Sequence, residues 1–257
     1  MNYIGSKRKI FKELSAYFPK HDIYIEPFLG GGSVFLLKDL AKYNILNDIN
    51  DEVFDYFTII KSKKYDLLKE IDELIVHESL FKYYKNKERT RFENAMYFIL
   101  KNTFTYLGAG DTLKITNWDI QSIKEKTKEE ISIFYEKLQN AIILNKDFRE
   151  FLKNITIRNK NDYKRIFIYC DPPYLESTNK YTENWKHTDL IELLNILKDY
   201  QKKGTNFIVS EHENEKIIDI AKDYNLNVYE IKKVNSMNKK INKEIILTNL
   251  NKVNKLF

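Results

Sequence analysis

The sequence predicts an α/β fold in which parallel strands alternate with helices. Short apolar runs of strand type recur along the chain, separated by stretches in which apolar residues have helical spacing. Three glycines at 30–32 stand between the first strand-type run and a helical stretch. An Asp-Pro-Pro-Tyr tetrapeptide at 171–174 follows a later apolar run, at the strand end where open α/β sheets bind ligands. The functional site is therefore expected at the carboxyl edge of the sheet.

The composition is that of a globular protein that can bury a sizeable core. The chain has 257 residues, of which 43% are hydrophobic and 31% charged, with only 7 Gly and 4 Pro; this excludes collagen-like and disordered classes. At roughly 150 residues per domain, the length predicts one large domain or two small ones. The single Cys excludes a disulfide framework and a thiolate-rich metal site within one chain. A chain with a single cysteine is typical of a reducing compartment.

No segment predicts export or membrane insertion. The N-terminal stretch interrupts its apolar positions every few residues, so no signal-peptide apolar region forms. No run of the chain approaches the length of apolar sequence that a spanning helix needs. The expected location is the cytoplasm, with no membrane association.

A βαβ unit is expected near the N-terminus. Residues 6–18 have apolar positions at helical spacing, and Ser6 is the expected N-cap of that helix. Residues 22–26 have a strand pattern, and the glycines form a tight turn. A second helix begins at Ser33, and residues 44–46 form a second strand.

The middle of the chain predicts an inserted helical subdomain. From about Tyr56 to Asn140 the pattern is mostly helical and rich in charge. We expect residues 57–140 to interrupt a domain made of residues 1–56 and 141–257. Aromatic and basic residues are mixed over 81–91, and two interpretations stay open: contacts with phosphates and bases, or one amphipathic helix with a solvated face.

The α/β pattern resumes after the insertion. Strand-type runs lie at 141–144, 165–169, 206–209 and 227–229. One helix is predicted from Asp189, with Asp189 and Glu192 in capping positions and Gly204 as its C-terminal stop. Residues 227–232 and 244–248 are predicted to form an antiparallel pair at the edge of the sheet.

Positive charge is concentrated near the C-terminus. The net charge is +6, and between Ile231 and Phe257 seven lysines stand against Glu244 alone, so this stretch carries the whole excess. Such a surface suits a polyanion, because lysines neutralise phosphates. A solvated lysine surface is the alternative interpretation.

The glycine run has the chemistry of a nucleoside-binding turn. Glycines let a ligand approach the backbone, and the helix that follows presents unpaired N–H groups. Asp48 follows the second strand, where a carboxylate can accept both hydroxyls of a ribose. Phe35 occupies the slot in which a dinucleotide fingerprint requires a third glycine after Gly30 and Gly32, which disfavours NAD. An ordinary turn followed by a surface acid is the alternative.

The Asp-Pro-Pro-Tyr tetrapeptide is suited to the exocyclic amine of a nucleobase. The prolines fix φ and leave carbonyl acceptors beside Asp171 with little freedom to relax. Tyr174 adds a flat ring on which a base can stack. Hydrogen bonds from the amine to Asp171 and to the Pro172 carbonyl would aim the nitrogen lone pair at an electrophile, so no covalent enzyme intermediate is required. A strand-end turn that happens to contain two prolines is the alternative.

Taken in order, these motifs resemble those of the Dam-like adenine-N6 DNA methyltransferases. The matching segments are residues 2–7, 26–35, 47–48, 171–174 and 244–249. The resemblance implies the Rossmann-like fold of S-adenosylmethionine-dependent methyltransferases, with residues 57–140 as an inserted, mainly helical target-recognition subdomain that binds DNA. It implies direct transfer of a methyl group from S-adenosylmethionine to N6 of a flipped-out adenine in double-stranded DNA.

The resemblance also implies roles for individual residues. The expected catalytic residues are Asp171, Pro172 and Tyr174. The expected donor-binding residues are Tyr3, Lys7, Phe28, Gly30, Gly32, Asp48, Asp147 and Asp171. Asn102 and Tyr106 lie in a segment that resembles the family's recognition segment and are expected to bind DNA; Arg89 and Arg91 are expected to bind DNA because they belong to the basic and aromatic stretch 81–91. Ala109 and Gly110 stand where the family often has an arginine, so the target sequence cannot be carried over.

The expected partners are double-stranded DNA and a cognate restriction endonuclease, for a protein encoded by a bacterium or a phage. No metal is expected, because the four histidines are scattered and no acid or histidine group has metal-ligand spacing. A cytosine-C5 enzyme is disfavoured, because Cys170 is expected to pack within its strand. Three alternatives stay open: methylation of cytosine N4 in DNA, methylation of adenine N6 in RNA, and non-catalytic binding of nucleic acid.

Overall fold

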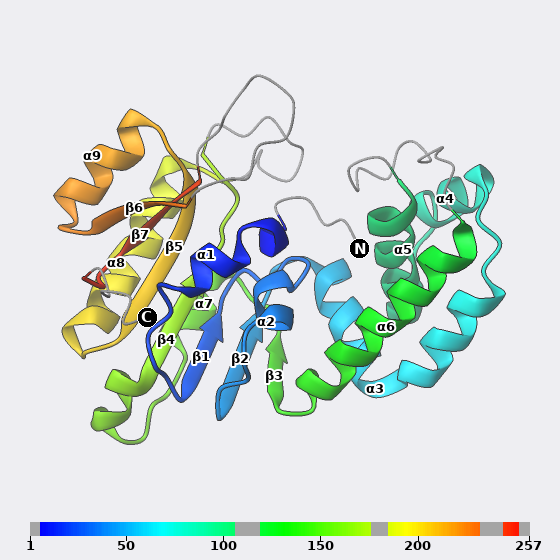
Figure 1. Ribbon diagram of the computed structural model, residues 1–257, viewed down its shortest axis with the longest axis horizontal. Helices are drawn as coiled ribbons and strands as arrows, with labels where there is room; N and C mark the ends of the chain where they lie inside the picture. The colour runs from blue at the N-terminus through cyan, green and yellow to red at the C-terminus, as the bar shows by residue number, and fades with distance from the viewer. Residues whose placement is uncertain (1–5, 106–118, 176–184, 232–243, 252–257) are drawn as a thin grey trace.

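A computed structural model describes residues 6–105, 119–175, 185–231 and 244–251. Within these ranges a seven-stranded sheet has the order β3-β2-β1-β4-β5-β7-β6 (Figure 1). Its strands are β1 (Ile23–Glu26), β2 (Tyr43–Asn47), β3 (Ala141–Leu144), β4 (Ile166–Cys170), β5 (Asn206–His212), β6 (Asn227–Ile231) and β7 (Glu244–Thr248). The predicted α/β class is confirmed.

The first five strands in the sequence are parallel, and the last two reverse the sheet. β1 pairs with β2 and β4, β2 with β3, and β4 with β5, all in parallel. β7 runs antiparallel to both β5 and β6. The predicted antiparallel pair therefore forms at the edge of the sheet, with β6 outermost and β7 between β6 and β5. Because the parallel strands share one direction, their carboxyl ends meet at a single edge.

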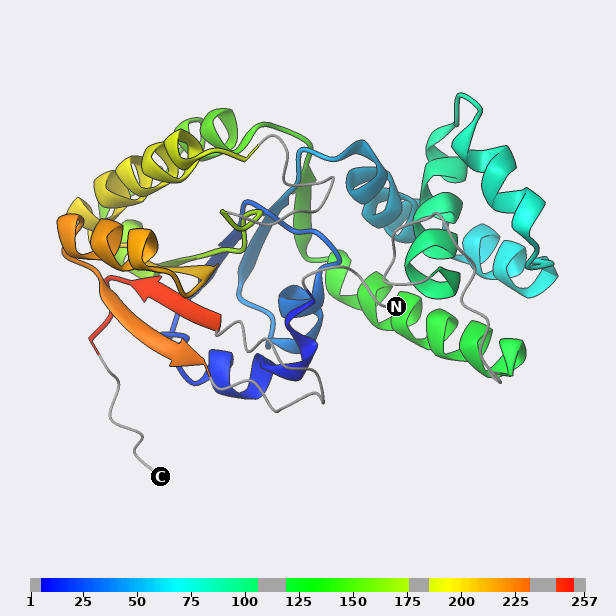
Figure 2. The ribbon, with the colours of Figure 1, turned by 90° about the horizontal axis from the view of Figure 1, so that it is seen from above.

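Helices cover both faces of this sheet (Figure 2). One face carries η1 (Lys7–Lys9), α1 (Phe11–Ser15) and α2 (Ser33–Leu37). The other carries α7 (Phe148–Lys153), α8 (His187–Lys202) and α9 (Glu215–Asp223). Successive strand residues serve opposite faces, as in β1, where Tyr24 packs on the α1 and α2 side and Ile25 on the α8 side. A further 3-10 turn, η3 (Lys160–Arg165), leads into β4.

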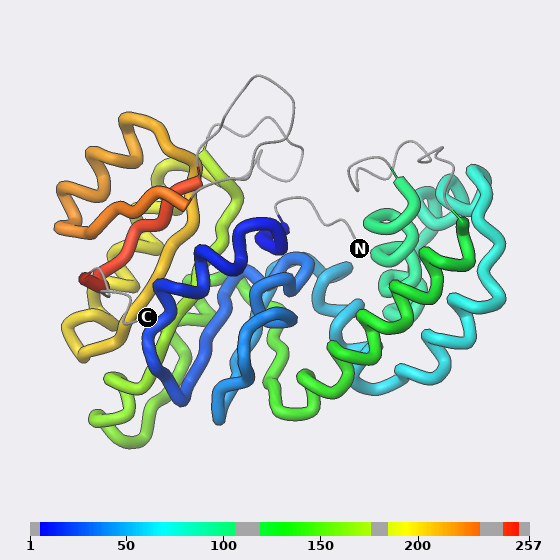
Figure 3. Tube along the Cα trace, viewed as in Figure 1, coloured from blue at the N-terminus to red at the C-terminus, as the bar shows by residue number. Residues whose placement is uncertain are grey.

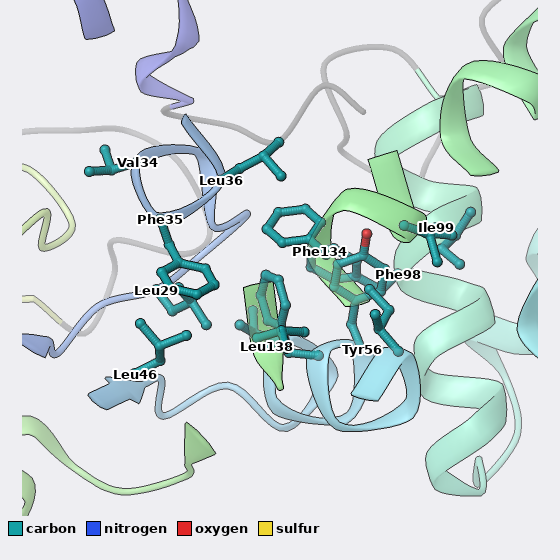
Figure 4. Close-up of a cluster of buried hydrophobic side chains, with 14 of the residues drawn as sticks. Leu29, Val34, Phe35, Leu36, Leu46, Tyr56, Phe98, Ile99, Phe134 and Leu138 are labelled. Carbon is teal, nitrogen blue, oxygen red and sulfur yellow. The ribbon is translucent and has the colours of Figure 1, made fainter. Parts of the chain in front are cut away.

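Four helices stand beside the sheet, between β2 and β3 in the sequence (Figures 1 and 3). They are α3 (Asp51–Glu73), α4 (Glu78–Lys85), α5 (Arg91–Phe104) and α6 (Ile120–Leu138). Their core is continuous with that of the sheet: in Figure 4, Phe134 and Leu138 of α6 lie between Phe35 of α2 and the pair Tyr56 and Phe98. The boundary expected between residues 56 and 57 lies inside α3.

Three predicted helices have different limits in the structure. The helix expected over 6–18 is divided into η1 and α1, and Ser6 makes no side-chain cap bond. The helix expected from Asp189 begins at His187; the N-cap is Lys186, and Asp189 is the third helical residue, whose carboxylate accepts the Lys186 N–H. The stretch 81–91 is not one helix, because α4 ends at Lys85 and Thr90 caps the start of α5.

The C-terminal stop of α8 is where the sequence predicts it. The helix ends at Lys202, and Gly204 has φ +99°. All seven lysines expected to form a basic surface lie at 232–243 and 252–257, outside the described residues. Among the described helices, none is both long and apolar enough to cross a membrane.

Candidate active site

The glycine turn joins the carboxyl end of β1 to α2 in a conformation that requires glycine. Gly32 has φ +66°, in the left-handed region, and a Cβ there would lie 2.7 Å from Cζ of Phe57. Gly30 has φ +50°, and its N–H donates to Oδ2 of Asp48 at 2.7 Å. The turn is therefore held against the end of β2 by the acid that the sequence places there.

Asp48 is oriented by the backbone around it. Besides the Gly30 bond, its Oδ1 accepts the N–H of Asn50 at 2.9 Å. The N–H of Ile49 also bonds to this carboxylate, so the backbone leaves it one of its roughly four acceptor positions. Burial raises the pKa of Asp48 to about 6, although these backbone bonds oppose the shift.

A second acidic centre follows β4, where the N-terminal segment meets the tetrapeptide. Nζ of Lys7 lies 2.6 Å from Oδ1 of Asp171 and 2.5 Å from the hydroxyl of Tyr174. Nζ also lies 3.4 Å from Oε1 of Glu244, which accepts the Tyr174 hydroxyl at 2.5 Å. Lys7 is only 3% exposed, and the Asp171 side chain is 21% exposed. One buried ammonium thus serves two carboxylates.

Burial and mutual charge set the protonation of this centre. Burial alone would lower the pKa of Lys7, but the carboxylates of Asp171 and Glu244 outweigh it and raise that pKa. Burial raises the pKa of Asp171, against the opposing charge of Lys7. Lys7 is therefore a permanent cation here, and Asp171 is more basic than an exposed aspartate.

The other tetrapeptide residues line the same centre. Pro172 is buried, and the ring of Tyr174 lies 4.1 Å from the ring of His212 at the end of β5. Glu211 accepts the N–H of Leu175, and burial raises its pKa to about 8. The strand ends of β4, β5 and β7 therefore converge on Tyr174.

Three buried acids of this edge were not predicted as site residues: Glu26, Glu211 and Glu244. Glu26 ends β1 and accepts the Tyr24 hydroxyl at 2.7 Å, and burial raises its pKa to about 8. The signal for these acids is a carboxylate at either end of an apolar strand, the first residue of β7 in the case of Glu244. Asp48 and Asp171 were predicted from the same signal.

Aromatic rings form one wall beside the glycine turn. Phe28, Phe148 and Trp185 meet with ring centroids 5.4 to 5.5 Å apart. Asp147 lies directly before Phe148, but its carboxylate caps α7 and pairs with Arg149. Phe28 is therefore next to the turn, whereas the Asp147 side chain is already engaged.

Three of the residues expected to bind DNA, Arg89, Arg91 and Asn102, lie on the part of the chain that forms α3 to α6. The Arg89 guanidinium donates to Glu52, to Asn94 and to the Tyr84 carbonyl, and it is only 17% exposed. Arg91 pairs with Asp55 but is 59% exposed. Asn102 is buried and donates to the Phe98 carbonyl. Tyr3 and Tyr106 lie outside the described residues.

Within the described ranges, no group of three or more His, Cys, Asp or Glu side chains is arranged to hold a metal ion. Cys170 is fully buried in β4, as expected, and burial raises the pKa of its thiol far above its usual value. That environment does not suit a nucleophilic thiolate.

The chain was compared with known families, curated proteins and solved structures. Residues 3–237 match the family model described as D12 class N6 adenine-specific DNA methyltransferase. The DNA adenine methylase of Escherichia coli is 25% identical over 230 residues, covering 83% of this chain and 80% of that protein. Modification methylase StsI of Streptococcus sanguinis is 29% identical over 260 residues, covering 89% of this chain and 38% of that protein. The rRNA methyltransferase aviRa of Streptomyces viridochromogenes superposes with a TM-score of 0.38 at 12% identity, over 93% of this chain and 81% of that structure.

Proposed function

The chain belongs to the D12 class of N6 adenine-specific DNA methyltransferases, and from this membership we propose which of its residues carry out the reaction. The reaction methylates N6 of adenine in DNA, and S-adenosylmethionine, when bound, supplies an electrophilic methyl group on a positively charged sulfur. The observation that carries the proposal is the Asp171 carboxylate, anchored by Lys7 at 2.6 Å directly after β4. These residues are separated by 164 positions in the sequence and meet only in the fold.

The residues at the ends of β1 and β2 fit a cationic nucleoside. Asp48 and Asp171 give this edge of the sheet negative charge, which suits a sulfonium. Asp48 would accept a ribose hydroxyl at the acceptor position that the backbone N–H groups of Gly30, Ile49 and Asn50 leave. Gly30 and Gly32 leave the turn without side chains, and Phe28 supplies a flat apolar wall. Asp147 is a weaker candidate for this role, because its carboxylate already caps α7 and pairs with Arg149.

Asp171 is the proposed acceptor for the target amine. Nζ of Lys7 and the hydroxyl oxygen of Tyr174 both contact its carboxylate at Oδ1, so Oδ2 can accept an amine N–H. The Pro172 carbonyl would accept the second N–H, and the ring of Tyr174 would stack on the base. Held in this way, the nitrogen lone pair is directed away from the carboxylate, toward the methyl group. The raised pKa of Asp171 suits it to take the proton that the methylated amine releases.

Adenine inside a duplex cannot reach this centre, because Asp171 and Tyr174 are largely enclosed. We therefore propose that the base is flipped out of double-stranded DNA. The helices α3 to α6 are the proposed target-recognition part, since they stand beside the carboxyl edge of the sheet. The modification methylase StsI among the relatives supports a restriction endonuclease as partner.

The test uses the purified protein with labelled S-adenosylmethionine and unmethylated duplex DNA. The expected product, after digestion, is labelled N6-methyladenine. Label in N4-methylcytosine would change the base and keep the mechanism. Label found only with an RNA substrate would overturn double-stranded DNA as the target. Binding of donor and DNA without any label would indicate a non-catalytic protein.

Changing Asp48 to Ala is expected to weaken donor binding by about tenfold to a hundredfold, because a charge-assisted hydrogen bond contributes roughly 1.5–3 kcal/mol. Donor affinity of the unaltered protein should also fall as the pH falls through about 6, since the ionised carboxylate exists above that pKa and is lost below it. Calorimetry between pH 5 and 8 measures both effects. Asp51→Ala, which removes an exposed acid three residues away, is the matched control. Equal affinities for the two variants would remove Asp48 from the donor site.

The two arginines of the helical section make different predictions. Arg91→Ala should reduce the salt dependence of DNA affinity by about one unit of slope if its exposed guanidinium contacts a phosphate. Arg89→Ala should instead lower the free energy of unfolding by about 2 kcal/mol, because it removes bonds to Glu52, Asn94 and Tyr84. DNA titrations at several salt concentrations and urea unfolding separate the two effects. An unaltered slope for Arg91→Ala would exclude it from the interface.

A further inference from the structure

Glu244 is a buried carboxylate at the start of an apolar strand. It is 4% exposed and is followed in β7 by Ile245, Ile246 and Leu247, all buried. The antiparallel register sets it opposite His212 at the end of β5. Burying a charge in such a strand is costly unless partners compensate it. Its Oε1 contacts Lys7 and Tyr174, the same groups that surround Asp171, and its Oε2 lies 3.9 Å from Nε2 of His212.

The hydroxyl of Tyr174 donates its hydrogen bond to Glu244 and not to Asp171. A phenol has one proton to donate, and its oxygen lies 2.5 Å from Oε1 of Glu244 but 3.3 Å from Oδ1 of Asp171. The proton therefore goes to Glu244, while the phenol oxygen accepts from Lys7 at 2.5 Å. These two hydrogen bonds at the hydroxyl fix the orientation of the Tyr174 ring.

The Lys7 ammonium contacts both acids, Asp171 and Glu244. It contacts Asp171 at 2.6 Å and Glu244 at 3.4 Å, both in an enclosed setting where charges interact strongly. One ammonium faces two carboxylates, Asp171 and Glu244, so it can hold Asp171 in place without neutralising the charge of both acids. Asp171 thus keeps negative charge with which to accept a hydrogen bond.

We propose that Glu244 is a positioning residue of the methyl-transfer centre, which fixes the ring of Tyr174 and balances the charge of Lys7 so that Asp171 remains a strong acceptor for the target amine. This inference rests on the proposed function of Asp171 and Tyr174. Glu244 itself acts through these two residues and through Lys7.

The test compares Glu244→Gln with Glu244→Ala in the full chain. Glutamine keeps the shape and an oxygen that accepts the Tyr174 hydroxyl but removes the charge, so kcat should fall roughly tenfold; alanine removes both, and kcat should fall roughly a hundredfold. KM for DNA and Kd for the donor should stay unchanged in both variants. Glu230→Gln, at an exposed glutamate of the neighbouring strand β6, is the matched control and should keep the kcat of the unaltered protein.

A double-mutant cycle separates positioning from general structural support. In a Tyr174→Phe background, Glu244→Ala should lower kcat by a smaller factor than in the unaltered protein, because the hydroxyl it orients is gone. Additive losses would overturn the proposal, as would kcat values for both Glu244 variants equal to that of Glu230→Gln. A loss confined to KM, or one that matches the unfolded fraction in near-UV circular dichroism, would also overturn it. If Glu244→Ala does not fold, the isosteric Glu244→Gln decides the outcome.

These results are distinguishable from failure of the proposed function. The unaltered protein must first give labelled N6-methyladenine, and Asp171→Ala must lose it. If both conditions hold and the Glu244 variants keep the kcat of the unaltered protein, the role proposed for Glu244 is wrong. The assignment of Asp171 to the methyl-transfer centre is then unaffected.

Discussion

Replacing Asp171 by Ala is expected to lower kcat by roughly a thousandfold or more, because the group that accepts the amine N–H and takes its proton is removed. Its anchor, Lys7, would retain Glu244 at 3.4 Å, so the buried ammonium is not left without a carboxylate. Binding of donor and DNA should therefore change much less than turnover. Single-turnover kinetics with labelled donor measure the chemical step directly.

Asp171→Asn refines this experiment. The amide keeps the volume and can still accept a bond from Lys7, but it cannot take up a proton, so the chemical step should remain severely impaired. Asp219→Ala in α9, which removes an exposed acid paired only locally with Lys222, is the control for loss of one negative charge. Turnover of Asp171→Ala close to that of Asp219→Ala would show that another group holds the amine.

Replacing Gly32 by Ala is expected to destabilise the whole fold. The left-handed backbone costs an alanine about 1–2 kcal/mol. The added Cβ would also lie 2.7 Å from Cζ of Phe57, a ring packed against Tyr56 and Phe134 and unable to move aside, which adds about 1–3 kcal/mol of overpacking. At about 2–4 °C per kcal/mol for a chain of this size, Tm should fall by roughly 4–20 °C in calorimetry.

Gly204→Ala separates the two contributions. Gly204 also has a positive φ, of +99°, but the added Cβ would meet only the flexible side chain of Lys164. This variant should show backbone strain without overpacking and a smaller fall in Tm. Equal falls for the two variants would mean that Phe57 relaxes, and that the glycine is required by the backbone alone.

Local sequence patterns were sufficient for much of the architecture. The βαβ unit, the helical insertion and the strand-end positions of Asp48 and Asp171 follow from periodicity and from glycines and prolines, which act on their immediate neighbours. The same information misplaced the start of α8, because a lysine N-cap has no sequence signature. Of the two interpretations left open for 81–91, the single helix is excluded, because the capping box of Thr90 and Glu93 starts a new helix.

The class of sheet, the glycine turn and the two motifs that follow β2 and β4 are encoded locally, since each depends on a few adjacent residues. Which side chains meet depends instead on how the elements pack in three dimensions. Lys7 reaches Asp171 across 164 positions, Tyr174 reaches Glu244 across 70, and Arg89 turns to Glu52 across 37. Partners so far apart are chosen by strand order and helix packing, in particular by the insertion of β7 beside β5, and no local pattern records that choice.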